Sequence, residues 1–216
     1  MENILNMENI LNKENVLNKE NVLIGSHNTM TYLPIECKWY LKPFMWIGNK
    51  LFAQCQNHNI YYQIFNSRVR VFDLRVYLGP NNQWNFAHGL VKYQTDYNLD
   101  RILRILSPYK FPIYVRILLE KYKNEEECDE FTKMCENIEQ TYPNITFFGG
   151  NRKGDWKKLY QFKNKEFTDD NNNQWVSSMA PDARWYEKIC PRLYAMRKNK
   201  SNKQKAKELT NLYDFV

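Results

Sequence analysis

The sequence predicts an α/β protein whose largely parallel sheet closes into a small, irregular TIM-type (β/α) barrel. Short apolar, β-rich segments alternate with amphipathic segments over most of the chain, as in parallel strands joined by helices. The 216 residues, 43% of them hydrophobic, are enough for one domain with a core. They are few for a barrel of this type, so we expect thin or missing helices and active residues at the carboxyl ends of the strands.

The chain begins with a hexapeptide repeat, MENILN twice and then KENVLN and KENVLI. Its apolar pair recurs every six residues, a period that fits neither a helix nor a strand. Six residues are also too few for one supersecondary unit of a solenoid. We interpret residues 1–18 as a low-complexity extension without a catalytic role, and residues 19–216 as a single barrel domain.

The first barrel strand is predicted at residues 22–26 and brings His27 to its carboxyl end. Residues 43–57 then carry apolar side chains at helical spacing and predict a helix. A further helical turn or two is predicted at residues 60–65.

A β-hairpin follows. Residues 68–78 alternate as a strand, residues 79–82 (GPNN) are a strong turn signal, and residues 84–87 form the returning strand. This hairpin brings His88 back toward the strand that carries Arg75.

The second half of the chain continues the alternation of strands and helices. Strands are predicted at residues 112–120, 145–148, 158–162 and 211–216, and helices at residues 99–106, 125–142, 186–196 and 203–209. Pro191 is expected to interrupt the third of these helices, because proline lacks the backbone N–H that a helix interior needs.

Composition limits the partners and the compartment. The net charge of +7 favours an anionic partner, but a basic run at residues 197–207 is typical of a solvated face and does not by itself indicate nucleic acid. Five cysteines without a CxxC pair argue against a zinc or redox motif and favour an intracellular location. No apolar run reaches the length of a membrane span or a signal peptide, so any membrane contact is expected to be peripheral.

Two histidines and an arginine carry the candidate chemistry. An ordinary imidazole pKa is about 6.5, so His27 and His88 could serve as general base and general acid near neutral pH. Phosphodiester cleavage needs such a pair, and the Arg75 guanidinium between the two imidazoles could stabilise charge on the phosphoryl oxygens. Asp73 lies two residues before Arg75, so both point to one face of their strand. The alternative is that both histidines are ordinary structural polar residues.

Three segments in order, GSHNTMTYL, RVRVFDLRVYL and FAHG, resemble the X-domain of the phosphatidylinositol-specific phospholipase C family. That family has a strand ending in G-[ST]-H-[DN]-[ST], a strand of the type R-x-x-D-[IL]-R, and then a His-Gly pair. The resemblance covers residues 20–90 and returns at the terminal NLYDFV. It implies a barrel of the PLC-like phosphodiesterase kind.

The resemblance also implies roles for individual residues. His27 would deprotonate the inositol 2-hydroxyl, His88 would protonate the departing diacylglycerol oxygen, Arg75 would bind the phosphate, and Asp214 would orient His27. The product would be a cyclic inositol phosphate. The candidates for substrate binding are Asn28, Asp73, Arg116 and Glu120.

Metal use divides the family. Its calcium-dependent members have an acidic residue at the position of Arg75 and Asn after the first histidine, whereas bacterial members have Arg and usually Asp. This chain combines Arg75 with Asn28. Because a fixed cation would repel a divalent ion, we expect a metal-independent site without a cofactor. Ca²⁺ held by oxygens of Asn28, Asp73 and Glu120 is the alternative.

These observations together predict a phosphoric diester hydrolase or lyase that cleaves an inositol phospholipid at a membrane surface. We expect a monomer with no nucleic-acid partner. One alternative is a glycerophosphodiesterase- or sphingomyelinase-like enzyme. Another is a catalytically inactive barrel that binds anionic lipid.

Overall fold

A computed structural model describes residues 23–93, 96–149, 158–163, 173–176, 182–204 and 210–216. The predicted low-complexity extension at residues 1–18 lies outside these described residues.

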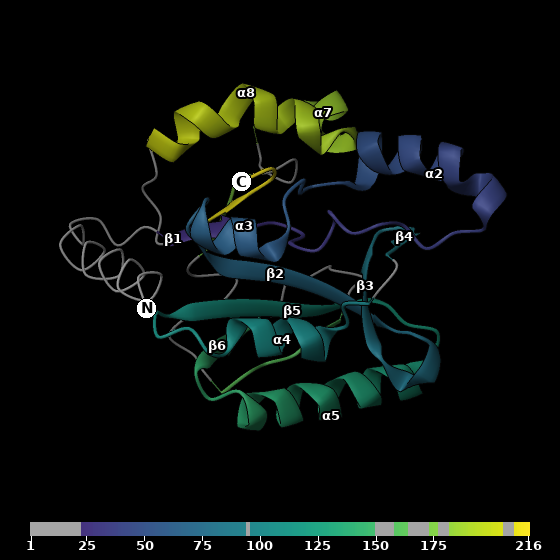
Figure 1. Cartoon of the computed structure of the whole chain (residues 1–216), viewed down its shortest axis with the longest axis vertical. Helices are drawn as coiled ribbons and strands as arrows, with labels where there is room; N and C mark the ends of the chain where they lie inside the picture. Colours follow the sequence, from purple (N-terminus) through teal and green to yellow (C-terminus); the bar gives the residue numbers. More distant parts are fainter. Residues whose placement is uncertain (1–22, 94–95, 150–157, 164–172, 177–181, 205–209) are drawn as a thin grey trace, which may run out of the picture.

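Six parallel strands form the centre of the molecule (Figure 1). Each pairs with the next in the order β8 (Asn173–Val176), β9 (Thr210–Tyr213), β1 (Leu23–Ser26), β2 (Val69–Leu78), β5 (Ile113–Lys121) and β6 (Ile145–Phe148). The first and the last of the described strands thus pair with each other, because β9 lies beside β1. Because all these strands run the same way, their carboxyl ends lie at one edge.

Three short strands extend this sheet with antiparallel pairs. β3 (Trp84–His88) pairs with the end of β2 after the turn η3 (Pro80–Asn82), which confirms the predicted hairpin. β4 (Val91–Lys92) pairs with β3, and β7 (Lys158–Leu159) pairs with β5.

The α/β fold class is confirmed, and the strands follow one another around the sheet as they do in a barrel. Within the described residues, parallel pairing ends at β6 on one side and at β8 on the other. The segment between these two strands lies mostly outside the described residues.

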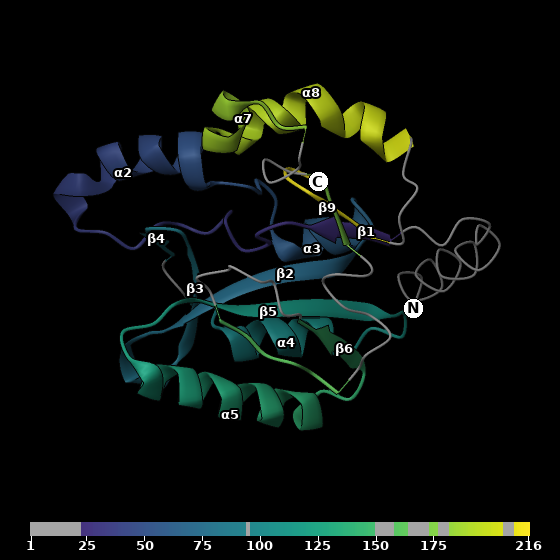
Figure 2. The same cartoon turned by 180° about the vertical axis from the view of Figure 1, so that it is seen from behind.

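Helices α4 (Leu99–Leu106) and α5 (Glu125–Thr141) lie together on one side of the sheet (Figures 1 and 2). The Asn124 side chain accepts from the backbone N–H of Glu127 and caps α5, whose first turn is acidic as the helix dipole favours. The face of α5 that packs against the core carries Phe131, Cys135 and Ile138, which are buried.

The predicted helix at residues 186–196 is two helices, α7 (Trp185–Ile189) and α8 (Pro191–Gln204). Pro191 separates them, as expected, and begins α8, since a first-turn proline loses no helical hydrogen bond. Of the helix predicted at residues 203–209, the first two residues end α8 and residues 205–209 lie outside the described part.

In place of the single helix predicted at residues 43–57, three shorter pieces begin earlier and end sooner, at residues 39–53. These are the 3₁₀ turn η1 (Trp39–Leu41), α2 (Lys42–Gly48) and the π-helical η2 (Asn49–Ala53), while α3 (Ile60–Phe65) forms as predicted. The large apolar side chains of the 39–53 segment do not face the core. Trp46 is 59% exposed and Phe52 is 54% exposed.

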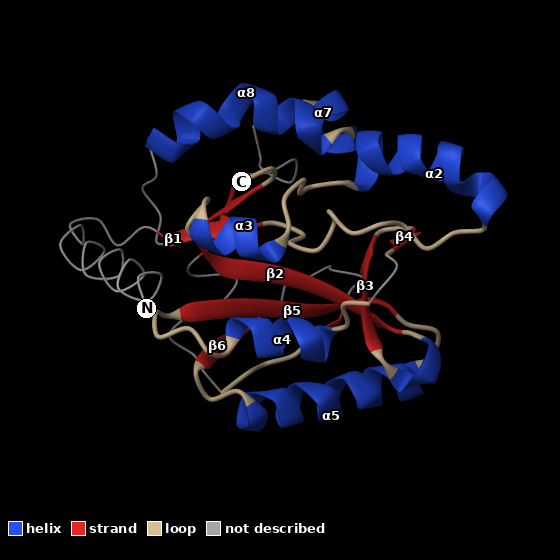
Figure 3. Ribbon diagram, in the orientation of Figure 1, coloured by secondary structure: helices blue, strands red, loops and turns tan. Residues whose placement is uncertain are grey.

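β2 is covered on both faces, so nearly all of its side chains are buried. Phe72, Leu74 and Val76 belong to the hydrophobic core, while Asp73 and Arg75 alternate with them on the other face. The ion pair of Asp73 and Arg75 is therefore enclosed in the protein. Figure 3 shows β2 in the middle of the molecule, between α3 and α4.

Candidate active site

The carboxyl ends of β1 and β9 bring His27 and Asp214 together. Ser26 pairs with Tyr213 in the register of these strands, and the N–H of His27 donates to the Tyr213 carbonyl at 2.9 Å. His27 and Asp214, which follow Ser26 and Tyr213, therefore leave the sheet side by side. His27 Nδ1 lies 2.6 Å from Asp214 Oδ1, and both side chains are buried.

Asp73 accepts hydrogen bonds from two guanidinium groups. Arg75 Nε donates to its Oδ2 at 3.1 Å, and Arg116, the facing residue on β5, donates to its Oδ1 at 2.8 Å. Burial alone would raise the pKa of Asp73, but the two cations hold it well below the usual range. Arg116 is only 1% exposed, so it serves here as a counter-charge for Asp73.

The contacts of His27 define its tautomer. Arg75 Nη2 lies 2.8 Å from His27 Nε2, and a guanidinium can only donate. His27 Nε2 is therefore an unprotonated acceptor, and Nδ1 carries the proton that is donated to Asp214. The basic lone pair of His27 thus faces Arg75.

His88 has the same tautomer for a different reason. Its Nδ1 lies 2.6 Å from the carbonyl oxygen of Ala53, which can only accept, so Nδ1 carries the proton. Burial, and then the charge of Arg75, lowers the pKa of His88 to about 4. Its ring is neutral near pH 7, and the ring centroids of His27 and His88 are 6.4 Å apart.

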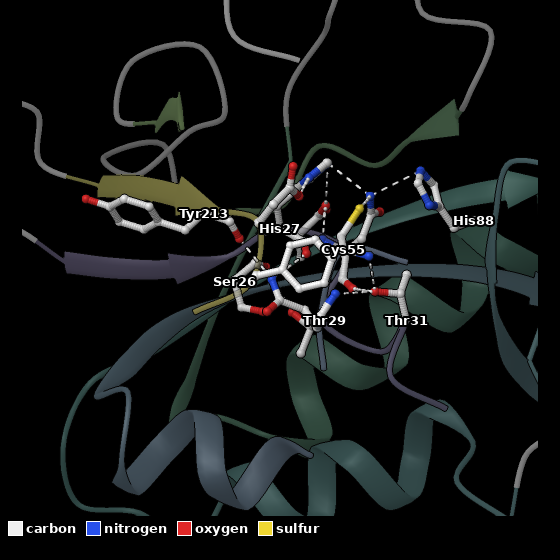
Figure 4. Close-up of polar contacts among 12 residues, drawn as sticks. Ser26, His27, Thr29, Thr31, Cys55, His88 and Tyr213 are labelled. Carbon is white, nitrogen blue, oxygen red and sulfur yellow. Dashed lines mark hydrogen bonds and ion pairs between the residues drawn. The ribbon is translucent and has the colours of Figure 1, made fainter. Parts of the chain in front are cut away.

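The amide of Asn28 lies between the imidazoles of His27 and His88. Figure 4 shows these two histidines within the polar cluster. Asn28 Nδ2 is 3.1 Å from Nε2 of His27 and 3.2 Å from Nε2 of His88, so one NH₂ group donates to both. Asn28 has a φ of 48°, in the left-handed region that Asn tolerates better than most residues. Within the described residues its buried Oδ1 has no hydrogen-bond partner.

Glu120 connects this cluster to the turn after β3. Its Oε1 accepts from the N–H of Gly89 at 2.6 Å, and its Oε2 lies 3.7 Å from Arg75 Nη1. Gly89 has a φ of 55°, which explains why glycine follows His88. Direct contacts thus join all eight residues predicted for the site, namely His27, Asn28, Asp73, Arg75, His88, Arg116, Glu120 and Asp214.

Sequence reasoning missed a second layer of buried polar residues. Gln56 Nε2 donates to the carbonyls of His27 and Tyr213, both at 2.9 Å. Thr31 Oγ1 accepts from the N–H groups of Cys55 and Gln56. The Cys55 thiol lies 3.3 Å from Asn28 Nδ2, and burial raises its pKa well above the ordinary value. No periodicity or motif singles these residues out, because their roles depend on long-range contacts.

Two groups of side chains could in principle ligate a metal. Single ligand atoms of His27, Cys55 and Asp214 lie within 4.8 Å of one another, but His27 and Asp214 already bind each other. Calcium needs about six to eight oxygen ligands. The second group is Asn28, Asp73 and Glu120, whose oxygens are the alternative calcium ligands. The Asp73 carboxylate already accepts hydrogen bonds from Arg75 and Arg116, and Glu120 Oε1 accepts one from the N–H of Gly89.

No family model and no curated protein matches the chain. Solved structures do match it, and their likeness shows that the fold is of the TIM-barrel type. One is the phosphatidylinositol-specific phospholipase C of Listeria monocytogenes, with a TM-score of 0.53 and 17% identity over 89% of this chain and 87% of that one. A double mutant of the Staphylococcus aureus enzyme matches with a TM-score of 0.53 and 17% identity over 92% of this chain and 86% of that one. At this identity the likeness shows the fold alone.

Proposed function

We propose that this protein is a phosphodiesterase of the phosphatidylinositol-specific phospholipase C type. One observation carries the proposal. Two neutral imidazoles, with ring centroids 6.4 Å apart, present unprotonated Nε2 atoms to one place beside Arg75. A general base, a general acid and a phosphate-binding cation are the groups that cleavage of a phosphodiester by a neighbouring hydroxyl requires.

In the proposed reaction, His27 Nε2 takes the proton of the inositol 2-hydroxyl, whose oxygen forms a bond to phosphorus. Asp214 stabilises the resulting imidazolium through Nδ1, 2.6 Å away. Arg75 stabilises charge on the phosphoryl oxygens. The bond from phosphorus to the diacylglycerol oxygen breaks, and His88 gives that oxygen a proton. The products are diacylglycerol and a cyclic inositol phosphate.

His88 must be protonated before it can act as the acid. In the free protein its pKa is lowered to about 4 by burial and by the charge of Arg75. A bound phosphodiester carries a negative charge that offsets Arg75 and raises this pKa. Substrate binding would thus favour the protonated form of His88, which the general acid requires.

Asn28 is proposed to move when substrate binds. Its amide fills the space between the two Nε2 atoms that the scissile phosphate must approach. The cavity beside Asn28 and Arg75 holds only about 10 Å³, less than one phosphate group. The side-chain carbonyl of Asn28, which has no partner in the described structure, could then accept from a substrate hydroxyl.

Metal independence is part of the proposal. Arg75 and Arg116 supply the positive charge that a calcium ion would bring, and they already occupy the Asp73 carboxylate. A divalent ion bound there would have to displace a buried ion pair, which is costly.

A lipid substrate is supported by exposed apolar side chains near the site. They lie on the 39–53 segment and on α7 and α8, which run along one side of the molecule (Figures 1 and 2). They include Trp39, Phe44, Trp46, Phe52, Trp185 and Met196. The segment ends at Ala53, whose carbonyl accepts from His88, so the apolar surface leads directly to the proposed catalytic groups. Large exposed apolar patches are typical of membrane or partner contacts.

We expect the protein to contact the membrane peripherally. Among the described residues, no helix is both long and apolar enough to cross a bilayer. Another similar structure, with a TM-score of 0.52 and 16% identity, is of the S. aureus phosphatidylinositol-specific phospholipase C and concerns the modulation of that enzyme's membrane binding.

The test is turnover of phosphatidylinositol vesicles in EDTA, with cyclic inositol phosphate followed by ³¹P NMR. His27→Ala and His88→Ala should each lower the rate by about 10²- to 10⁴-fold. His58→Ala is the matched control, because this third histidine stacks on Tyr62 outside the cluster, and it should leave the rate unchanged. Absence of turnover with and without Ca²⁺ would contradict the proposal. Turnover that EDTA abolishes would favour a metal-dependent phosphodiesterase instead.

A further inference from the structure

Asp214 lies one residue beyond β9, where the pairing of this strand with β1 and β8 has ended. Its position against His27 therefore depends on the contacts that hold the segment 213–216. Phe215, the next residue, has a φ of 53°, in the left-handed region that residues with large side chains rarely adopt, and its N–H donates to the Cys55 carbonyl at 2.6 Å. Such a conformation persists where the surrounding contacts fix it, and it is common at functional sites.

The buried side chain of Gln56 holds the backbone of both members of the pair formed by His27 and Asp214. Gln56 Nε2 donates to the carbonyls of His27 and Tyr213, both at 2.9 Å. Gln56 Oε1 accepts from the N–H of Val216 at 3.2 Å. One amide thus fixes the backbone of His27 relative to the chain on either side of Asp214.

A second amide reaches the same segment from α8, which lies next to this end of the chain (Figures 1 and 2). Asn199 Nδ2 donates to the carbonyl of Asp214 at 2.6 Å and to the carbonyl of Phe215 at 3.1 Å. Among the described residues, the buried Oδ1 of Asn199 has no hydrogen-bond partner. The amide therefore keeps its two donated bonds although they leave an acceptor unsatisfied, which is costly.

Ion pairs anchor the turn of α8 that carries Asn199. Arg197 forms a bidentate pair with Glu187 of α7, through Nε at 2.5 Å and Nη2 at 2.6 Å. Lys198 Nζ lies 2.7 Å from Oδ2 of Asp182. The residues directly before Asn199 thus tie α8 to α7 and to the segment before it, so the donor amide has a fixed origin.

We propose that Gln56 and Asn199 are positioning residues that hold the Asp214 carboxylate against His27. This inference rests on the proposed function and deepens it, because it names two groups that act through Asp214 without touching the substrate. The carboxylate must stay 2.6 Å from His27 Nδ1 to stabilise the imidazolium that forms when His27 takes a proton. Misplacement of a catalytic group by about 1 Å can lower a rate about 10²-fold. The alternative is that both amides contribute to stability alone.

Asn199→Leu and Gln56→Met test the proposal, because each new side chain has a similar shape but cannot form the hydrogen bonds. In the phosphatidylinositol vesicle assay, each variant should lower kcat about 10²-fold. The apparent KM should stay unchanged, since the Arg75 guanidinium keeps its contacts. Asn199 is only half-buried, so Asn199→Leu carries the test if the fully buried Gln56→Met does not fold. A kcat within about threefold of the native value in the folded variants would overturn the proposal.

Two comparisons separate positioning from stability. A group that acts through Asp214 has little further effect once Asp214 is changed, so Asn199→Leu should lower kcat less than about threefold in an Asp214→Asn background. The same loss in both backgrounds would contradict the proposal. Asn124→Ala is the matched control, because it removes the amide that caps α5 and should reduce stability without changing kcat. An equal loss of kcat in this control would show that the rate follows stability, and it too would overturn the proposal.

Proton NMR tests the geometry without requiring turnover. The Nδ1 proton of His27 is bonded to Asp214 and that of His88 to the Ala53 carbonyl, both at 2.6 Å, so each should give a downfield signal. His27→Ala and His88→Ala assign the two signals. Asn199→Leu should shift or broaden the signal of His27 and leave that of His88 in place. An unchanged His27 signal, or equal changes in both signals, would refute the positioning role.

The two experiments also distinguish this inference from the proposed function. A chain that cleaves no phosphatidylinositol, but whose His27 signal alone changes in Asn199→Leu, would refute the proposed function and support the positioning of Asp214. A chain that cleaves the lipid equally well with and without the Asn199 amide would keep the proposed function and refute the inference.

Discussion

His88 should make the protein less stable as the pH falls from 7 to 4. In the folded state its pKa is lowered to about 4, first by burial and then by the charge of Arg75. In the unfolded chain it should titrate at about 6.5, the ordinary value. Between these two values the unfolded state binds the proton and the folded state does not, so acid favours unfolding.

The size of the effect follows from the two pKa values. A change from about 6.5 to about 4 is roughly 2.5 units, and each unit corresponds to about 1.4 kcal/mol, which totals about 3 kcal/mol. This stabilisation is fully present above pH 6.5 and is lost as the pH falls to about 4. It is a large share of the 5–15 kcal/mol that is typical for the free energy of unfolding of a domain.

Urea unfolding of the native chain and of His88→Gln, each from pH 7 to pH 4, isolates this contribution. All other titrating groups are common to the two proteins, so only the difference between their pH profiles reports on His88. The native chain should lose about 3 kcal/mol more than the variant over this range. NMR titration gives an independent reading, because only three histidine signals have to be assigned.

Two results would refute the reasoning. The first is a His88 signal that titrates near pH 6.5 in the free protein. The second is a pair of parallel stability profiles, with the same loss in acid for the native chain and for His88→Gln. Either result would mean that burial and Arg75 do not keep this imidazole neutral.

Three further changes have defined outcomes. Asp214→Asn should lower kcat about 10⁴-fold in the vesicle assay, because the amide no longer stabilises the protonated form of His27. Asn59→Ala should lower the free energy of urea unfolding by about 1 kcal/mol, because Asn59 caps α3 by accepting from the N–H of Tyr62. Trp46→Ala should weaken sedimentation with phosphatidylinositol vesicles by about tenfold or more, since burying a large apolar side chain contributes about 1.5–3 kcal/mol.

Each of these expectations has an outcome that contradicts it. A kcat within threefold of the native value in Asp214→Asn would remove Asp214 from the mechanism. An unfolding midpoint unchanged by Asn59→Ala would mean that the cap is replaced by solvent. For Trp46, the control is Tyr61→Ala on α3, which is 46% exposed. An equal loss of vesicle binding in both variants would contradict a specific role for the apolar surface.

The sequence by itself determined the elements whose signals are local. The structure forms α4 at residues 99–106 and β6 at residues 145–148 with the predicted bounds. The GPNN turn produces the predicted hairpin, and strand alternation puts Asp73 and Arg75 on one face, 3.1 Å apart. Periodicity, capping residues and turn residues act over a few positions, so one segment suffices to read them.

The motifs also predicted a set of residues that the structure brings together, although not their arrangement. We expected Arg75 between the two imidazoles, but the structure has the Asn28 amide there and Arg75 against His27. We considered Arg116 for substrate contact, and the structure buries it against Asp73. Such details depend on strand register and on a left-handed residue, neither of which a motif specifies.

Only the tertiary structure decided which groups share a proton and which surfaces remain free. Asp214 lies 187 positions from His27 and reaches it only because β9 pairs with β1. The apolar spacing at residues 43–57 predicted helical structure, which forms only as far as Ala53, and its large side chains face outward because no element among the described residues covers them. Local patterns encode the backbone conformation of a segment, whereas the partner of each face is set by contacts between residues far apart in the chain.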